Sequence, residues 1–192
     1  EFMKNQGVER VVLARETPIE IIQQACQIGV EIEVFTYGAI CISYSGQCMM
    51  STSVKNRSAN RGMCAQCCRL KYTRVDGSHF KEGDYILSPK DLNVIDQLPS
   101  LLDAGVSSLK IEGRMKRSEY VYLVIKTFRE AIDAYYANKS YHVSSERLKQ
   151  LEEMFYRGFS NGHLFHDDVT HRMSQYRPNH QGIAIGKVLA YR

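Results

Sequence analysis

The sequence predicts an α/β fold, with about four strands of a βα barrel followed by the start of a small β domain. Short apolar runs rich in β-branched residues alternate with segments of helical periodicity, which is typical of parallel strands joined by helices. About four strands are enough for half of an eight-stranded barrel but not for a closed one. After Ala137 the pattern changes, and an alternating apolar segment at 182–190 is typical of a strand.

The expected elements follow one another as strand, helix, strand, long loop, strand, helix, strand and helix. The first strand contains the apolar β-branched run at 11–13, and Thr17 then caps a helix that Pro18 opens. The last of these helices carries an apolar stripe from Val121 to Tyr135, as expected where a helix packs on a core. The strands are expected at 9–14, 30–35, 85–87 and 108–111, and the helices at 18–28, 91–102 and 119–136.

The chain divides into three segments. Half of a βα barrel carrying the cysteines is expected over 3–139, and a helical connector with a helix at 144–156 over 140–178. The first strand of a C-terminal β domain is expected over 179–192. A half barrel exposes apolar sheet edges, so a homo-oligomer or a paralogous partner subunit is expected to cover them.

Composition excludes several classes of protein. Of the 192 residues, 44% are hydrophobic and 24% are charged, which argues against wholesale disorder. The longest apolar stretch, at 34–42, is far shorter than the roughly 18–20 residues of a membrane span, and the amino terminus lacks the order of a signal peptide. We therefore expect a cytoplasmic protein with no membrane partner.

Charge is distributed unevenly along the chain, whose formal net charge is +4. Residues 34–75 contain no Asp or Glu, so the basic side chains there are not balanced locally. Such a segment indicates an anionic partner, and the phosphate backbone of nucleic acid rewards clustered Lys and Arg whatever the base sequence. The candidate nucleic-acid contacts are Lys55, Arg57, Arg61, Arg69, Lys71 and Arg74.

Five of the six cysteines fall in the same segment, with the spacing Cys41-x6-Cys48-x15-Cys64-x3-Cys68 and Cys67 beside the last. In a reducing compartment such clustering indicates metal binding or thiol chemistry. Structural zinc sites favour close pairs, and only the second pair here is close, whereas irregular spacing suits an iron–sulfur cluster. An iron–sulfur cluster, zinc and no metal at all stay open at this point. Adjacent residues rarely both reach one cluster, so Cys67 or Cys68 is expected to be a spectator.

Charged side chains at strand ends are the candidates for catalysis, because the active site of a βα barrel lies at the carboxyl ends of its strands. Glu33 lies in the second expected strand, and Glu112 with Arg114 follows the fourth. An acid beside an arginine is also a common structural ion pair, and both interpretations stay open. The sequence contains no G-x-S-x-G and no H-E-x-x-H motif.

Several of these residues lie in motifs that resemble peptidase family U32, the collagenase-like family. The opening segment at 11–16 and Leu87-Ser88-Pro89-Lys90-Asp91-Leu92 also fit its pattern. Matches extend from about residue 8 to about residue 188. The most specific motifs are Glu33-x-Phe35-x-x-Gly38-Ala39-Ile40-Cys41, Ser43-Tyr44-Ser45-Gly46-Gln47-Cys48, Asn60-Arg61-Gly62-x-Cys64-x-x-x-Cys68-Arg69 and Lys110-Ile111-Glu112-Gly113-Arg114-Met115-Lys116.

The resemblance implies a fold and a cofactor that the residues alone leave open. It implies that this chain is the second half of a TIM-type barrel, without the amino-terminal half, plus the first strand of a small β domain. It also implies that Cys41, Cys48, Cys64 and Cys68 hold a 4Fe–4S cluster, which selects Cys68 over Cys67. One departure is Tyr37, where many relatives have histidine.

The activity that the resemblance implies is oxygen-independent hydroxylation. Relatives act on the wobble uridine of tRNA, on a ribosomal RNA cytidine or on the ubiquinone ring, and the basic segment favours the prephenate-dependent tRNA branch, with tRNA as the partner. A collagenase-like peptidase of unassigned mechanism is the alternative. A zinc-stabilised binding module without catalysis is the second alternative.

Overall fold

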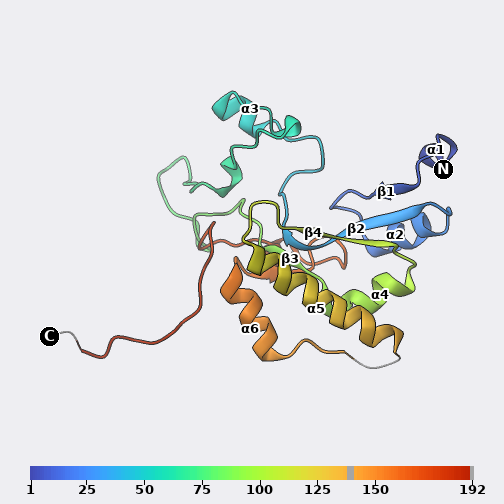
Figure 1. Cartoon of the computed structure of the whole chain (residues 1–192). Helices are drawn as coiled ribbons and strands as arrows, with labels where there is room; N and C mark the ends of the chain where they lie inside the picture. The colour runs from blue at the N-terminus through green and yellow to red at the C-terminus, as the bar shows by residue number, and fades with distance from the viewer. Residues whose placement is uncertain (138–140, 191–192) are drawn as a thin grey trace.

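The computed structural model describes residues 1–137 and 141–190 as a mixed α/β fold built on one five-stranded sheet (Figure 1). Its strands are β1 (Arg10–Val12), β2 (Glu31–Ala39), β3 (Asp91–Asn93), β4 (Ser108–Glu112) and β5 (Phe159–Ser160). The α-helices are α1 (Phe2–Asn5), α2 (Ile19–Cys26), α3 (Met50–Lys55), α4 (Leu98–Asp103), α5 (Ser118–Tyr136), α6 (Ser145–Met154) and α7 (Val169–Arg172). Three short 3₁₀ turns are η1 (Ala59–Arg61), η2 (Cys67–Arg69) and η3 (Ile95–Gln97).

Strand β2 is the centre of the sheet. It pairs in parallel with β1 and β4, and in antiparallel with β3, which in turn pairs in parallel with β5. The α/β class is therefore confirmed, but the sheet is mixed and does not confirm half of a parallel barrel. β4 lies directly beside β2, where four consecutive parallel strands would have placed another strand between them.

Two expected elements around β3 are wrong. Residues 85–87 form a turn and not a strand, because the Tyr85 amide bonds to the Gln175 carbonyl and the Ser88 amide closes back on Tyr85. The segment 91–93, expected to open a helix, is strand β3, since the Asp91 amide bonds to the Gly158 carbonyl in the pairing with β5. Tertiary pairing thus overrides the local helix signal, and the helix itself begins only at Leu98.

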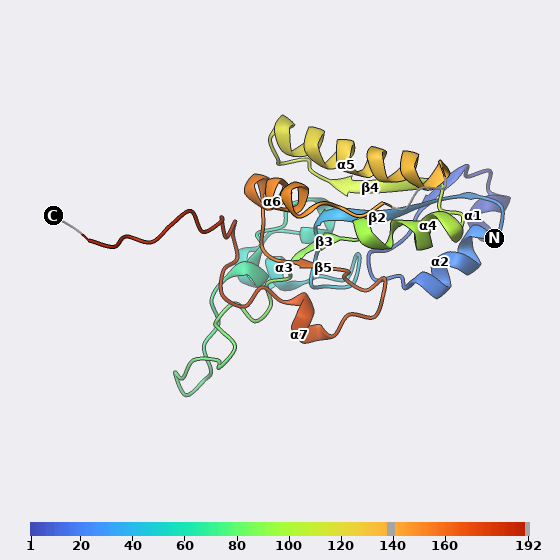
Figure 2. The ribbon, with the colours of Figure 1, turned by 90° about the horizontal axis from the view of Figure 1, so that it is seen from below.

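The other helices form close to their expected bounds, and two apolar clusters hold them against the sheet. The stripe of α5 packs on Tyr37 of β2 and on α6, and Figure 2 shows α5 lying along β4. The first cluster, under α2, contains Ile22, Ile32, Val34, Leu92, Val94, Leu101, Val106 and Leu164. The second, under α5 and α6, contains Tyr37, Ile95, Leu98, Tyr120, Val124, Phe128, Ala131 and Leu151.

A β-bulge divides β2 between these clusters. The register with β4 shifts between Phe35 and Tyr37, so Thr36 has no partner there and its hydroxyl donates to the Lys110 carbonyl. Beyond the bulge, Gly38 has φ +102, and a Cβ added there would overlap the carbonyl oxygen of Glu112. This close approach needs glycine, and it sets the carboxyl ends of β2 and β4 side by side.

The C-terminal third contains α6, β5 and α7, and the boundary expected between 139 and 140 lies outside the described residues. The strand expected at 182–190 does not form in the described part of the tail, which extends from the body in Figure 1. No neighbouring strand of the described chain pairs with it, and the side chains of Ile185, Val188 and Leu189 are exposed. Residues 191–192 lie outside the described residues. Within the described ranges, no helix combines the length and hydropathy that a membrane crossing requires.

Candidate metal centre and surrounding charges

The cysteine loop, residues 41–68, leaves the carboxyl end of β2, contains α3 and η1, and ends within η2. Figure 1 shows it projecting from the side of the sheet opposite to α5 and α6. The connection between β1 and α2 helps to hold it, because the Glu16 carboxylate accepts hydrogen bonds from the Ser45 amide at 2.8 Å and the Ser45 hydroxyl at 3.0 Å. Burial raises the pKa of Glu16, but the hydrogen bonds from Ser45 outweigh it, so the net shift is downward.

Three of the predicted cysteines lie close enough to the fourth, Cys68, to affect its pKa. Burial raises the pKa of the Cys68 thiol, and Cys41, Cys64 and Cys48 raise it further through charge repulsion, while Arg69 opposes them. Cys41, Cys48 and Cys64 therefore lie in the same region of the structure as Cys68, although the four are up to 27 positions apart in the sequence (68 − 41 = 27). A cation among the sulfur atoms would relieve this repulsion.

The two remaining cysteines lie elsewhere. Cys67 is 3% exposed and packs inside the chain, and Cys26 packs against the cluster under α2. The Cys64 sulfur accepts the Gln66 amide at 3.3 Å, and the Ser51 hydroxyl lies 4.0 Å away. Gln66 has φ +53, a left-handed conformation that turns its N–H toward the sulfur.

The four sulfur atoms do not form a closed single-ion shell. Across residues 1–137 and 141–190, no three His, Cys, Asp or Glu side chains stand in a geometry ready to hold one metal ion. Zinc requires each sulfur to approach to about 2.3 Å. An iron–sulfur cluster is a larger object than a single ion, and its ligand positions are spread around it.

Glu33 lies away from this centre. It pairs with Ser108 in the register of β2 and β4, five positions before the pairing of Gly38 with Glu112, or about 16 Å along the strand. The Lys110 ammonium at 3.0 Å and the Ser108 hydroxyl at 2.8 Å lower the pKa of the Glu33 carboxyl. The structure therefore places Glu33 in a cross-strand ion pair with Lys110.

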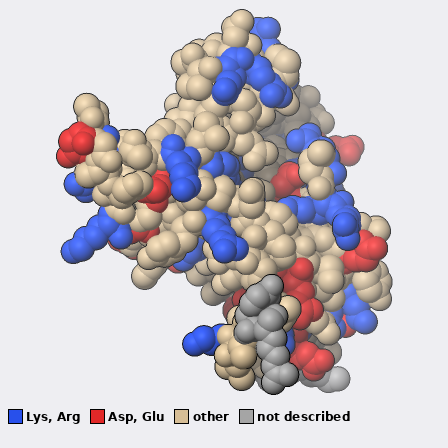
Figure 3. All heavy atoms as spheres, turned by 90° about the vertical axis from the view of Figure 1, so that its left-hand side faces the viewer, with Lys and Arg blue, Asp and Glu red and all other residues tan. Residues whose placement is uncertain are grey.

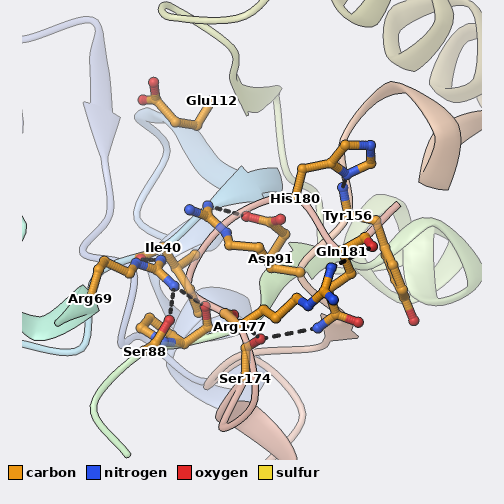
Figure 4. A network of polar contacts seen from close by, with 12 residues as sticks. Ile40, Arg69, Ser88, Asp91, Glu112, Tyr156, Ser174, Arg177, His180 and Gln181 are labelled. Atoms are coloured by element: carbon orange, nitrogen blue, oxygen red, sulfur yellow. Dashed lines mark hydrogen bonds and ion pairs between the residues drawn. The ribbon is translucent and has the colours of Figure 1, made fainter. Parts of the chain in front are cut away.

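Glu112 and Arg114 do lie at the carboxyl end of β4, as expected. The Glu112 side chain is partly buried and stands apart from the surrounding network in Figure 4, with no dashed line to it. Arg114 is exposed. Unlike Glu33, neither residue forms an ion pair with the described part of the chain.

A buried ion pair that the sequence did not reveal lies beside the cysteine loop. Arg157 donates to Asp91 at 2.5 Å, and their side chains are 8% and 4% exposed. Among the described atoms, Asp91 Oδ2 and Arg157 Nε have no hydrogen-bond partner. The sequence predicts Asp91 as the start of a helix, and no local sequence pattern identifies Arg157. The pair could therefore not be predicted.

Lys116 was also missed, although it closes the motif that begins at Lys110. It lies over the Phe155 ring in a pocket of about 570 Å³ that Tyr120 and His180 also line. Burial lowers the pKa of Lys116 to about 8, with Asp91 raising it and Arg157 lowering it further. A lowered lysine pKa is common at functional sites, and it depends on burial in the folded chain, so the sequence could not reveal it.

The predicted nucleic-acid contacts divide into two groups. Five are exposed, whereas Arg69 is partly buried and bonds to the Ile40 carbonyl, Ser88 and Pro89. Figure 3 shows that the upper part of this face, formed around α3, carries Lys and Arg and no Asp or Glu. The exposed five are Lys55, Arg57, Arg61, Lys71 and Arg74.

Comparison with known proteins identifies one family and several relatives. The sequence model described as "Peptidase family U32" matches residues 1–174. The chain is 40% identical over 163 residues to "tRNA hydroxylation protein P1" of Bacillus subtilis, covering 80% of this chain and 39% of that protein. It is 43% identical over 169 residues to "Collagenase" of Porphyromonas gingivalis, covering 84% and 46%.

A third relative is "23S rRNA 5-hydroxycytidine C2501 synthase" of Escherichia coli, 39% identical over 168 residues, covering 82% of this chain and 26% of that protein. No solved structure matches the chain. The chain thus spans less than half the length of each of these three curated relatives.

Proposed function

The chain belongs to peptidase family U32, and from this premise we propose that it is part of an iron–sulfur protein that supports oxygen-independent hydroxylation of the tRNA wobble uridine. The observation that carries the proposal is the gathering of four thiols within an acid-free basic loop at the carboxyl end of β2. Two relatives whose names specify RNA hydroxylation support it.

Cys41, Cys48, Cys64 and Cys68 would hold the 4Fe–4S cluster, which supplies electron transfer when bound. The chain's own contribution is to gather the thiols, to donate the Gln66 amide to Cys64 and to place the Arg69 charge near Cys68. Because burial and repulsion keep the Cys68 thiol protonated, binding must release its proton. Zinc is the alternative occupant, and metal analysis separates the two.

Glu112 and Arg114 are the proposed substrate-facing residues, because they lie at the strand end near this centre without a structural ion pair among the described residues. We also propose that the parallel strands β1, β2 and β4 form one wall of a larger barrel in the whole protein. The open outer edges of such a wall would be covered by the rest of the barrel or by a second subunit.

The proposed tRNA contact predicts a strong dependence on salt. If the five exposed cations of the acid-free segment 34–75 meet phosphates, the logarithm of the affinity should fall against the logarithm of salt with a slope of about −4. Lys55→Met should reduce the size of that slope by about 1. Lys126→Met, on the exposed face of α5, is the matched control and should leave it unchanged. A slope near zero in a titration of tRNA binding would contradict phosphate contact.

A second candidate function is proteolysis, favoured by the 43% identity to a relative named collagenase. The test is degradation of a collagen-like peptide by the purified chain. Activity that persists through repurification and disappears on changing one residue, such as Glu112→Gln, would support it. Activity that separates from the chain during repurification would belong to a contaminant.

A further inference from the structure

The two ends of the cysteine loop are joined by one side chain. Ile40 comes directly before Cys41, and Arg69 comes directly after Cys68. The Arg69 guanidinium donates through Nη2 to the Ile40 carbonyl at 3.3 Å. Closing a flexible loop costs conformational entropy, so a bond at its base offsets a cost that metal binding would otherwise meet alone.

The same guanidinium is fixed on its other side by the segment that leads into β3. Nη1 donates to the Ser88 hydroxyl at 2.7 Å and to the Pro89 carbonyl, and Ser88 is 0% exposed. Figure 4 shows Arg69 directed at Ile40 and Ser88 beside Asp91. The planar fork of arginine suits this arrangement, because it offers several donors in fixed directions to acceptors held by the sheet.

Arg69 also faces the thiols electrostatically. Burial lowers its pKa to about 10, Arg157 lowers it further, and Cys68, Asp91 and Cys41 oppose the shift. The guanidinium therefore stays charged at neutral pH. Arg69 directly follows Cys68 and bonds to the carbonyl of the residue before Cys41, so its guanidinium lies at both ends of the loop.

We propose that Arg69 is a positioning residue that closes the base of the cysteine loop and keeps Cys41 and Cys68 adjacent before any metal binds. This role replaces the phosphate contact expected for Arg69 from sequence, because its hydrogen bonds are directed into the chain. The closure itself does not depend on the proposed function. Its consequence for iron binding does.

The test measures hydrogen exchange in the metal-free, reduced full chain. The amides of Leu70 and Tyr72, bonded to the Cys67 and Asp84 carbonyls, report opening at the base of the loop. Arg69→Met removes three hydrogen bonds and should speed their exchange on the order of tenfold or more. Arg69→Lys should also speed it, because an ammonium keeps the charge but cannot span the three acceptors.

Arg61→Met is the matched control, since it removes the same charge from an exposed position of the same loop. It should leave the exchange unchanged. If Arg69→Met unfolds the whole chain, Ser88→Ala removes a single acceptor and should speed the same amides several-fold. Exchange in a folded Arg69→Met or Ser88→Ala variant that equals that of Arg61→Met would overturn the proposal.

Iron retention is the second measurement. At limiting iron, Arg69→Met should bind several-fold less than Arg61→Met. If neither variant nor the parent chain binds iron while the exchange result holds, the proposed cofactor fails and the loop closure stands. If iron binding is normal and the exchange is unchanged, the closure fails and the cofactor stands.

Discussion

Replacing Cys68 with alanine is expected to remove nearly all iron and acid-labile sulfide from the reconstituted chain, whereas Cys67→Ala should retain them. Cys68 senses the other three thiols electrostatically, while its neighbour Cys67 is packed inside and contributes to the core. Loss of a cluster ligand removes a metal–thiolate bond, but loss of Cys67 removes only packing. Iron and sulfide per chain, measured after anaerobic reconstitution, separate the two.

Two more variants make this comparison robust. Cys64→Ala should lose iron like Cys68→Ala, and Cys26→Ala, in α2, should keep it. Thermal unfolding of each metal-free variant checks that its fold is intact. Equal iron loss in Cys26→Ala and Cys64→Ala would mean general misfolding, and full iron in Cys68→Ala would remove it from the ligand set.

Asp91→Asn is expected to lower the free energy of unfolding by about 3–5 kcal/mol, because it leaves the buried Arg157 charge without its partner. Asp91 Oδ2 and Arg157 Nε have no hydrogen-bond partner among the described residues, so no other described group there replaces the lost bond. Denaturant unfolding under reducing conditions measures the change.

The matched control is Asp133→Asn, which breaks the exposed pair between Arg129 and Asp133 on α5. Those side chains are 56% and 66% exposed, so the loss should be at most about 0.5 kcal/mol. A similar small loss in both variants would show that the Asp91 pair is not buried in solution. The double variant Asp91→Asn, Arg157→Met should recover part of the loss, since it removes the orphaned charge.

The sequence predicted correctly those helices whose formation depends mainly on residues near one another in the chain. The apolar stripe of α5 and the proline at the start of α2 depend on nearby residues, and both helices form close to where the sequence places them. The cap expected from Thr17 does not form, because Pro18 is the N-cap and no described side chain bonds to the first turn. The strand β3 could not be found this way, because its backbone partners are more than 50 positions away from it in β2 and β5. Asp91 and Leu92, where the sequence predicts the start of a helix, instead pair with the neighbouring strands of the sheet.

In the candidate site too, only the residues that share a local sequence pattern were predicted. The cysteines were predicted because thiol spacing in sequence is itself the signal, and in the structure Cys41, Cys48 and Cys64 lie close enough to Cys68 to raise its pKa. Asp91 and Arg157 are 66 positions apart, so no spacing rule connects them. In the sequence, Arg69 cannot be distinguished from the other basic residues of its segment. Only the structure shows that its hydrogen bonds are directed into the chain.

The most direct test is iron and acid-labile sulfide analysis of the chain purified without oxygen. The account predicts a brown protein with about four iron atoms and about four sulfides per chain. A colourless protein with stoichiometric zinc and no sulfide, or one that takes up neither metal, would contradict it.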